Sequence, residues 1–196
     1  MSIDLPFPLV LASQSPRRQQ LLREAGYRFE VVPPSTSAET GEMPNETVPD
    51  LVARMARQKA EDVASRIRHP AIIVACDTVA ELDGEAIGKP HHRRHAQQIL
   101  RRLSGREHRV YSGLHLIRTT DHRRAQRVER SDLRMKRLSE EDIDAYLDSG
   151  QWEGKAGAFG YQDGHPWLEL ISGTADNVVG LPLQSLHQLL AELTTT

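Results

Sequence analysis

The spacing of hydrophobic residues along the chain switches between the pattern of buried strands and that of one-sided helices. Continuous apolar runs at 8–12 and 71–76 predict two buried strands, and the alternation of YRFEVV at 27–32 predicts a half-buried one. Further strands are predicted at 107–117, 125–137 and 167–172. Apolar residues at helical spacing predict helices over 16–25, 46–68, 92–103, 139–149 and 183–193.

Strands and helices alternate early in the chain, whereas strand pairs dominate its middle. Residues 79–87 are predicted to form a hairpin that turns at Asp83–Gly84, and residues 33–45 and 173–182 are predicted to form a loop and a turn. This order predicts an α/β fold with a mixed sheet. The 196 residues suffice for one hydrophobic core, so a single domain over 1–196 is expected.

Composition narrows the class of protein. Hydrophobic residues make up 38% and charged residues 27%, as in soluble globular proteins, and the net charge of −2 gives no positive field for long nucleic acid. No apolar run approaches the about 20 residues of a membrane span, and no basic segment precedes the short apolar stretch near the N-terminus, as a signal peptide requires. Cys76 is the one cysteine, so we expect a cytoplasmic protein without internal disulfides.

The helix predicted to begin at Pro16 carries charges of the unfavourable sign. Ser15 fits the N-cap and Pro16 the first helical position, so Arg17 and Arg18 fall in the first turn. That end of a helix is already partly positive, and a basic residue there costs about 0.3–1 kcal/mol. A bound anion would reverse the sign of this effect, because backbone N–H groups and both guanidinium groups would then face negative charge.

Lys59 is the second misplaced cation, because it lies near the middle of the apolar stripe of helix 46–68. Either its stem packs while the ammonium reaches outward to water, or the ammonium meets an anion in a cleft. Lys89 in GKP and Lys155 in the glycine-rich GKAGAFGYQ add two lysines in loops. His108, which opens a strand, is expected to be structural.

Two acidic residues stand among these cations in the predicted topology. Asp77 directly follows the apolar strand 71–76, where open α/β sheets place their ligands, and Glu39 lies in the loop after strand 27–32. Several cations and two carboxylates on loops and element ends match a polyphosphate that carries a divalent metal, with Glu39 and Asp77 holding Mg²⁺ or Mn²⁺. The residues alone do not decide which bond is broken.

The chain resembles the Maf family of nucleoside triphosphate pyrophosphatases over nearly its whole length, from Leu9 to about Leu190. The resemblance rests on the order and spacing of several short motifs rather than on any one of them. They are LASQSPRR at 11–18, Glu39, KA at 59–60, DT at 77–78, GKP at 88–90, LSGREH at 103–108, GKAGAFGYQ at 154–162 and NVVGLP at 177–182.

The resemblance implies a single α/β domain with a mixed, strongly twisted sheet flanked by helices, similar to inosine triphosphate pyrophosphatases, with a cleft between two lobes. It implies a homodimer, a divalent metal, and hydrolysis of a nucleoside triphosphate to monophosphate and pyrophosphate. Asp77 would be the general base, and Arg17, Thr78 and Gln162 would select dTTP and UTP. The remaining residues that it implies in substrate binding are Ser13, Ser15, Arg18, Lys59, Lys89 and Lys155.

Three departures from the usual pattern bear on the choice of substrate. Gly154 and Phe159 stand where this branch of the family usually has aspartate and tyrosine, and Ala38 precedes Glu39 where a second acidic residue is usual. The departures leave open a sister specificity, for CTP or 7-methyl-GTP. The resemblance itself, through the family's link to septum formation, leaves a second alternative, a nucleotide-binding regulator of cell division.

Overall fold

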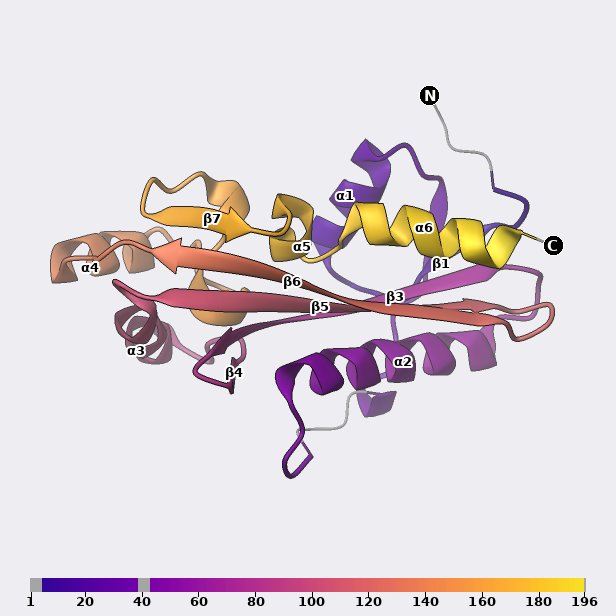
Figure 1. Ribbon diagram of the computed structural model, residues 1–196, viewed down its shortest axis with the longest axis horizontal. Helices are drawn as coiled ribbons and strands as arrows, with labels where there is room; N and C mark the ends of the chain where they lie inside the picture. Colours follow the sequence, from indigo (N-terminus) through magenta and orange to yellow (C-terminus); the bar gives the residue numbers. More distant parts are fainter. Residues whose placement is uncertain (1–4, 39–42, 196) are drawn as a thin grey trace.

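The computed structural model describes residues 5–38 and 43–195, and its centre is one open mixed sheet (Figure 1). Within the described residues the sheet has seven strands, of which six follow one another across it and β4 pairs with β3 beside them. In spatial order the six are β2 (Phe29–Val31), β1 (Leu9–Leu11), β3 (Ile72–Leu82), β5 (Glu107–Arg118), β6 (Arg124–Met135) and β7 (Leu168–Ser172), and β4 spans Glu85–Ile87.

The sheet combines two kinds of strand pairing. β1 pairs parallel with β2 and with β3, and the remaining pairs are antiparallel. The β3–β4 hairpin turns at Asp83 and Gly84, which have φ angles of 56° and 85°. Positive φ at both central residues is what a tight two-residue hairpin requires, so the predicted Asp–Gly turn is confirmed.

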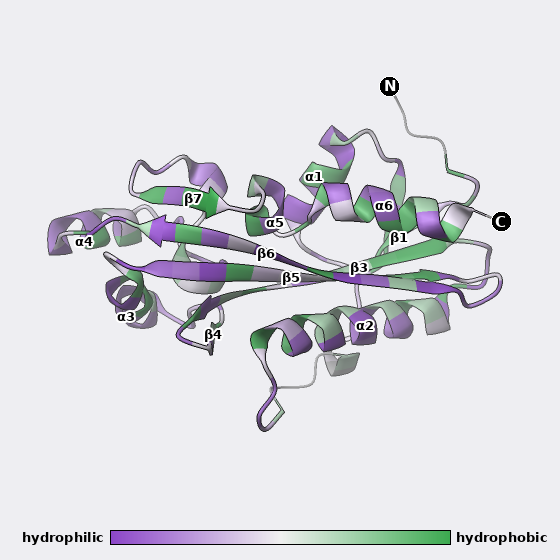
Figure 2. Ribbon diagram, viewed as in Figure 1, coloured by the Kyte–Doolittle hydropathy of each residue, from purple (hydrophilic) through white to green (hydrophobic). Residues whose placement is uncertain are grey.

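Helices cover both faces of the sheet (Figure 1). The longest, α2 (Val48–Arg66), lies on one face and turns its apolar side to β3 and β5, whereas α1 (Pro16–Glu24) and α6 (Leu183–Thr194) lie on the other (Figure 2). The further helices are α3 (Arg93–Leu103), α4 (Glu140–Asp148) and α5 (Ala175–Val179), with short 3-10 helices η1 (Thr36–Ala38), η2 (Ala156–Ala158) and η3 (Tyr161–Asp163).

Close contact between α2 and the sheet depends on one glycine of β5. A Cβ atom added to Gly113 would lie 2.8 Å from the backbone nitrogen of Ala53 and closer still to the carbonyl of Val52. Since real Cβ contacts essentially never fall under 3.0 Å, no side chain fits here without moving the helix. The absence of a side chain at this position therefore sets the depth at which α2, with Lys59, lies on the sheet.

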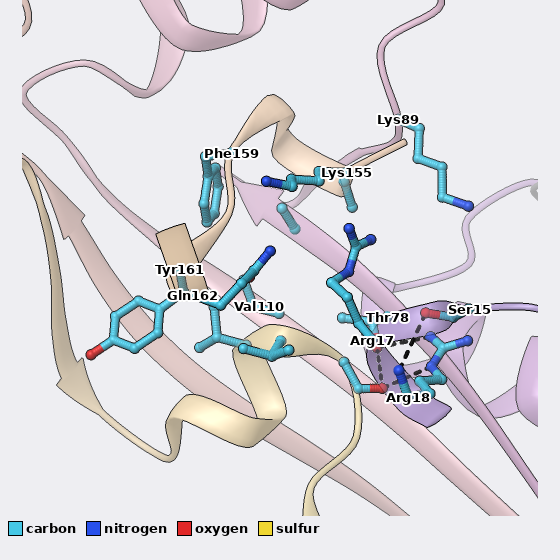
Figure 3. A pocket seen from close by; sticks show the side chains of 15 residues that line it. Ser15, Arg17, Arg18, Thr78, Lys89, Val110, Lys155, Phe159, Tyr161 and Gln162 are labelled. Carbon is cyan, nitrogen blue, oxygen red and sulfur yellow. Dashed lines mark hydrogen bonds between the residues drawn. The ribbon is translucent and has the colours of Figure 1, made fainter. Parts of the chain in front are cut away.

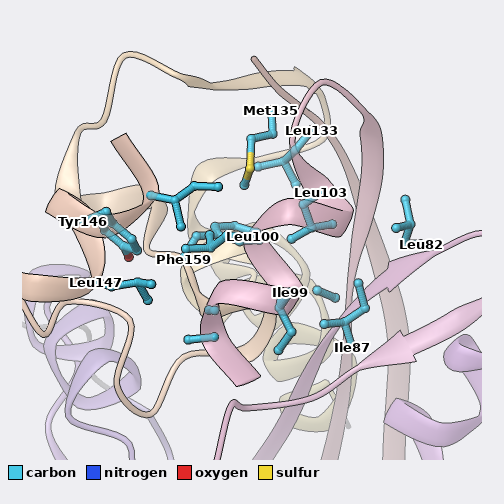
Figure 4. Close-up of a cluster of buried hydrophobic side chains, with 14 of the residues drawn as sticks. Leu82, Ile87, Ile99, Leu100, Leu103, Leu133, Met135, Tyr146, Leu147 and Phe159 are labelled. Atoms are coloured by element: carbon cyan, nitrogen blue, oxygen red, sulfur yellow. The ribbon is translucent and has the colours of Figure 1, made fainter. Parts of the chain in front are cut away.

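The buried side chains form separate clusters at the two ends of the sheet. One cluster joins α3 and α4 to the ends of β3, β5 and β6, with Leu100, Leu133 and Phe159 among its members (Figure 4). Two others cover opposite faces of β1 and β3 at the other end, against α1 and α6 on one face and α2 on the other. The expected α/β fold with a mixed sheet between helices is thus confirmed.

Most predicted elements are present within a few residues of their expected bounds, and two predictions are wrong. Strand 71–76 does not end before Asp77, because pairing with β5 continues through Asp77–Gly113 and Thr78–Ser112 to the hairpin. The predicted turn at 173–182 contains the helix α5, which Thr174 caps by accepting a hydrogen bond from the Asn177 amide. In the described part of the chain, no helix is long and apolar enough to span a bilayer.

Candidate active site

β3 has an open edge in its middle, and the candidate site lies there. On one side β3 pairs continuously with β5, whereas on the other β1 pairs with residues 72–74 and β4 with residues 80–82. Among the described residues, no strand therefore borders 75–79 on that side. Because side chains alternate along a strand, Asp77 points to the α2 face from this gap and Thr78 to the α1 face.

Three adjoining pockets meet at the gap, and Arg18 and Lys89 line all three. We call them the η2 pocket, between α1, β3 and the glycine-rich segment; the α1 pocket, between α1 and residues 34–36; and the α2 pocket, between α2, β4 and α3. The η2 pocket is lined by predicted site residues from distant segments (Figure 3), namely Ser15, Arg17, Arg18, Thr78, Lys89, Lys155 and Gln162. Ser13 lines the α1 pocket, Lys59 both the α1 and α2 pockets, and Asp77 the α2 pocket.

Arg18 is held in place by protein groups. Its Nε donates to the carbonyl of Gly180 at 2.8 Å, Nη1 to Ser13 Oγ at 3.2 Å and Nη2 to Thr78 Oγ1 at 3.2 Å. These bonds join α1 to the segment after β1, to β3 and to the segment after α5. Arg18 therefore offers its charge to the pockets from a fixed position, with its side chain already ordered.

Arg17 lies beside Arg18 and reaches the opposite wall. Its Nη2 donates to the carbonyl of Gly154 at 3.2 Å. Burial, followed by the nearby charge of Arg18, lowers the pKa of Arg17 from its ordinary value, and Asp163 acts in the opposite direction. Two adjacent guanidinium groups in a partly buried pocket favour an anionic ligand, because such a ligand relieves their mutual repulsion.

Lys59 and Asp77 form an ion pair inside the cleft. The ammonium lies 2.6 Å from Asp77 Oδ1, and the two side chains are 8% and 15% exposed. Outward snorkelling of Lys59, one of the two alternatives, is therefore wrong. The pair lies where α2 meets the open edge of β3, so a carboxylate and an ammonium share one water-accessible wall of the α2 pocket.

Thr78 stands one residue further along β3 and belongs to a different set of contacts. Besides accepting from Arg18, its hydroxyl oxygen lies 2.8 Å from Ser112 Oγ on β5. Ser112 in turn donates to the carbonyl of Asn177 at 3.2 Å, and the Asn177 side chain donates to Ser131 at 2.8 Å. A buried row of polar groups thus runs from the pocket to α5 and β6.

The glycine-rich segment forms the wall that faces α1. Lys155 forms an ion pair with Asp163, which ties the start of this segment to η3, and both side chains are largely buried. A Cβ atom on Gly160 would collide with both charged groups, so the pair packs directly on the backbone there. Phe159, Tyr161 and Gln162 follow along the same wall, and the Tyr161 ring is turned away from Thr78 and Arg18 (Figure 3).

Asp77 offers one carboxylate oxygen to a hard divalent cation that is bound together with phosphate. Asp77 Oδ1 is held by Lys59, so its other carboxylate oxygen is the available donor, and Mg²⁺ commonly binds one or two carboxylates plus substrate phosphates and waters. The other predicted ligand, Glu39, lies outside the described residues. Within those residues, no group of three or more His, Cys, Asp or Glu side chains is arranged to hold a metal.

Some residues of the site had escaped sequence reasoning. Ser112 contacts Thr78 and Asp163 contacts Lys155, yet a serine within a strand and an aspartate after Gln162 carry no local signal of this role. His108 is buried as expected of a structural histidine, packs edge-on against Phe159 and has its pKa lowered to about 4 by burial.

Comparisons with known proteins agree on one family. The family model for Maf-like proteins matches residues 8–193. A dTTP/UTP pyrophosphatase of Rhodopirellula baltica is 50% identical over 186 residues, which cover 94% of this chain and 82% of that protein. A dTTP/UTP pyrophosphatase of Carboxydothermus hydrogenoformans is 40% identical over 185 residues, which cover 94% of this chain and 97% of that protein.

Solved structures give more distant matches. A HAM1 protein from Coxiella burnetii aligns with 96% of this chain and 98% of its own at 20% identity and a TM-score of 0.48. A nucleoside-triphosphatase / dITP/XTP pyrophosphatase from Mycobacterium abscessus aligns with 95% of this chain and 94% of its own, at 16% identity and a TM-score of 0.43.

Proposed function

The chain belongs to the family of Maf-like proteins, and from this premise we propose that it hydrolyses dTTP and UTP to the nucleoside monophosphate and pyrophosphate. The substrate follows the names of its relatives, which are dTTP/UTP pyrophosphatases at 50% and 40% identity. The three residues expected to select these bases, Arg17, Thr78 and Gln162, all line the η2 pocket. The proposal includes Mg²⁺ or Mn²⁺ as cofactor, a cytoplasmic location and a homodimer.

The convergence of cations from separate elements carries the proposal. Arg17 and Arg18 come from α1, Lys59 from α2 and Lys89 from the segment after β4, and all four line the adjoining pockets at the open edge of β3. Among the described residues, the acidic side chains that line these pockets are Asp77 and Glu153. A triphosphate satisfies such a surplus of positive charge, and the N–H groups at the start of α1 add further donors.

In this proposal Asp77 acts on the water that attacks the α-phosphorus. Lys59 fixes one carboxylate oxygen, which leaves the other to orient the water and accept its proton as the new phosphorus–oxygen bond forms. The bond from the α-phosphorus to the bridging oxygen then breaks, and pyrophosphate leaves. Arg17, Arg18 and Lys89 stabilise the charge that builds up on the departing group.

A divalent cation completes this arrangement. Asp77, together with Glu39, would hold it, and when bound it would screen the phosphate charges and lower the pKa of the attacking water. The chain's own cations remain necessary in this scheme, since a triphosphate carries more negative charge than one divalent ion neutralises.

The nucleobase is expected to occupy the η2 pocket. Phe159 and Tyr161 are among the residues that line it, and Thr78 and Gln162 supply polar groups that can read the edge of a pyrimidine. A site that forms hydrogen bonds to the correct base rejects others strongly, because the wrong base leaves buried polar groups unpaired.

A panel of nucleotides tests the proposal. The protein is incubated with dTTP, UTP, CTP, ATP, GTP and 7-methyl-GTP with Mg²⁺ or Mn²⁺, and the products are identified by chromatography. Monophosphate and pyrophosphate from dTTP and UTP are expected. Orthophosphate as the sole product would contradict the bond assigned, and dTTP and UTP as the poorest substrates would favour a sister specificity.

Asp77→Asn separates catalysis from binding. Loss of the general base is expected to lower kcat by at least about 10²-fold, whereas nucleotide binding should still be detected by calorimetry. Wild-type protein that binds nucleotide without turnover under either metal would instead support a regulator of cell division.

A further inference from the structure

Thr78 is connected to a buried chain of hydrogen bonds whose direction can be worked out. Its hydroxyl oxygen lies 2.8 Å from Ser112 Oγ, and Ser112 Oγ lies 3.2 Å from the carbonyl oxygen of Asn177. Ser112 is 0% exposed, so bulk water does not take part in these bonds. The single proton of each hydroxyl group can therefore be assigned from the protein groups around it.

The proton of Ser112 belongs to the bond with Asn177. A carbonyl oxygen can only accept, and a buried one needs a donor. In a continuing helix that donor would be the amide of Leu181, but this amide donates to the carbonyl of Asp176 at 2.9 Å. Ser112 therefore donates to Asn177, which leaves the Ser112 oxygen as an acceptor for the hydroxyl group of Thr78.

Thr78 is consequently a donor toward the protein interior and an acceptor toward the pocket. Its proton goes to Ser112 or to the carbonyl of Gly180, which lies 3.4 Å away and already accepts from Arg18 at 2.8 Å. One of its two lone pairs accepts from Arg18 Nη2. The second lone pair remains for a ligand in the η2 pocket, which Thr78 lines.

We propose that Ser112 is a positioning residue that fixes the Thr78 hydroxyl as a hydrogen-bond acceptor for the base. This inference rests on the proposed function, in that it takes the η2 pocket to hold a pyrimidine nucleotide. An acceptor there pairs with the ring N3–H of uracil or thymine. In cytosine the N3 atom carries a lone pair and no hydrogen. It therefore repels the hydroxyl oxygen of Thr78 and leaves that oxygen without a donor.

Ser112→Ala tests the assignment, with Ser131→Ala as its matched control. Both serines are fully buried, and both bond to Asn177, but Ser131 contacts the Asn177 side chain and Thr174 rather than Thr78. In Ser112→Ala the Thr78 hydroxyl loses its nearest interior acceptor and becomes able to turn its proton toward the pocket. The preference for UTP over CTP, measured as the ratio of kcat/KM values, is expected to fall about tenfold, and Ser131→Ala should keep the wild-type ratio.

Binding without turnover keeps this test separate from that of the proposed function. Affinities for the α,β-methylene analogues of UTP and CTP are measured by calorimetry for the wild type and both variants. An inactive wild type would overturn the proposed reaction, while the binding ratio would still decide the role of Ser112. Ser112→Cys, which keeps the volume with a weak donor, replaces the alanine variant if that variant does not fold, and the same loss of preference is expected.

Three results would overturn the role of Ser112. The first is an unchanged ratio in a folded Ser112 variant. The second is an equal loss in Ser131→Ala, which would assign the effect to general loosening around Asn177. The third is a wild-type protein that binds the UTP and CTP analogues equally well.

Discussion

Lys59 occupies a position on α2 that helical periodicity assigns to the core, and its partner explains how a cation is tolerated there. The ammonium is 2.6 Å from Asp77, and the stem packs among apolar neighbours of the helix. Helical spacing could show that the residue was misplaced, but it could not choose between solvent and a cleft. That choice depended on Asp77, 18 residues away in sequence and on another element.

Lys59→Met should remove the charge while keeping most of the buried volume. If Lys59 fixes Asp77 and stabilises the phosphates, kcat/KM for dTTP should fall by about 10²–10³-fold. Steady-state release of pyrophosphate measures the effect. Lys136→Met, at an exposed position away from the three pockets, should retain wild-type kcat/KM. An active Lys59→Met enzyme would assign this lysine to packing alone.

His108 predicts a pH dependence of stability. Burial lowers its pKa from 6.5 to about 4, so between these values the unfolded chain binds a proton that the folded protein does not. His108 therefore does not reduce the free energy of unfolding above pH 6.5, and it reduces this free energy progressively as the pH falls toward 4. The loss over this interval is of the order of 3 kcal/mol. The burial of His115 shifts its pKa in the same direction.

Urea unfolding of wild type and His108→Gln at several pH values isolates this contribution. The free energy of unfolding of the wild type should fall more steeply than that of the variant between pH 6.5 and pH 4. Protonation of carboxylates also destabilises the folded protein in acid. The same carboxylates are present in the wild type and the variant, so their contribution cancels in the difference. Parallel curves would mean that His108 is protonated in the folded state.

Among the elements, β3 is the one whose sequence was most misleading. The polar pair Asp77–Thr78 ends an apolar run, which predicts the end of a strand, yet pairing with β5 continues to residue 81. The real edge is lateral, where β1 stops pairing at residue 74 and β4 begins at residue 80. The pattern of apolar and polar residues in the sequence indicates which residues are buried. It does not indicate which strands pair with each other, because that pairing is set when the sheet assembles.

Gly113→Ala tests the packing of α2 on the sheet. The added methyl group would overlap the backbone at Val52 and Ala53, so the helix must shift, at a cost of about 3 kcal/mol in the free energy of unfolding. Thermal and urea unfolding measure this loss, and activity should fall too because Lys59 moves with α2. Gly88→Ala is the control, since a Cβ there has nothing within 4 Å. Equal stability of the two variants would refute the close approach.

Considered as a whole, the molecule gathers its candidate site from segments spread over most of the chain. α1, α2, β3, the segment after β4 and the glycine-rich wall all contribute to the adjoining pockets. The α/β class and the cationic residues were predictable because periodicity and charge are local properties. The pairing of Lys155 with Asp163 and the chain through Ser112 were not, because their partners are set by tertiary contacts.

A ligand that bridges so many elements should stabilise the whole fold. At a dTTP concentration of 100 times its dissociation constant, with metal present, linkage gives about 2.7 kcal/mol. For a chain of this size that corresponds to a rise in Tm of about 5–10 °C. Differential scanning fluorimetry with the slow Asp77→Asn variant avoids turnover, and Arg17→Ala should reduce the shift. A Tm that nucleotide leaves unchanged would contradict binding across these elements.

The open edge of β3 also bears on how such an enzyme changes during evolution. Asp77 and Thr78 are consecutive in sequence but project to opposite faces, so the roles proposed for them in hydrolysis and in base recognition fall on different sides of β3. If the proposed roles hold, mutations on the α5 side, at Ser112 for example, are expected to alter which base is accepted while the Lys59–Asp77 pair stays intact. A lineage can then acquire a new nucleotide preference through intermediates that all retain catalytic activity.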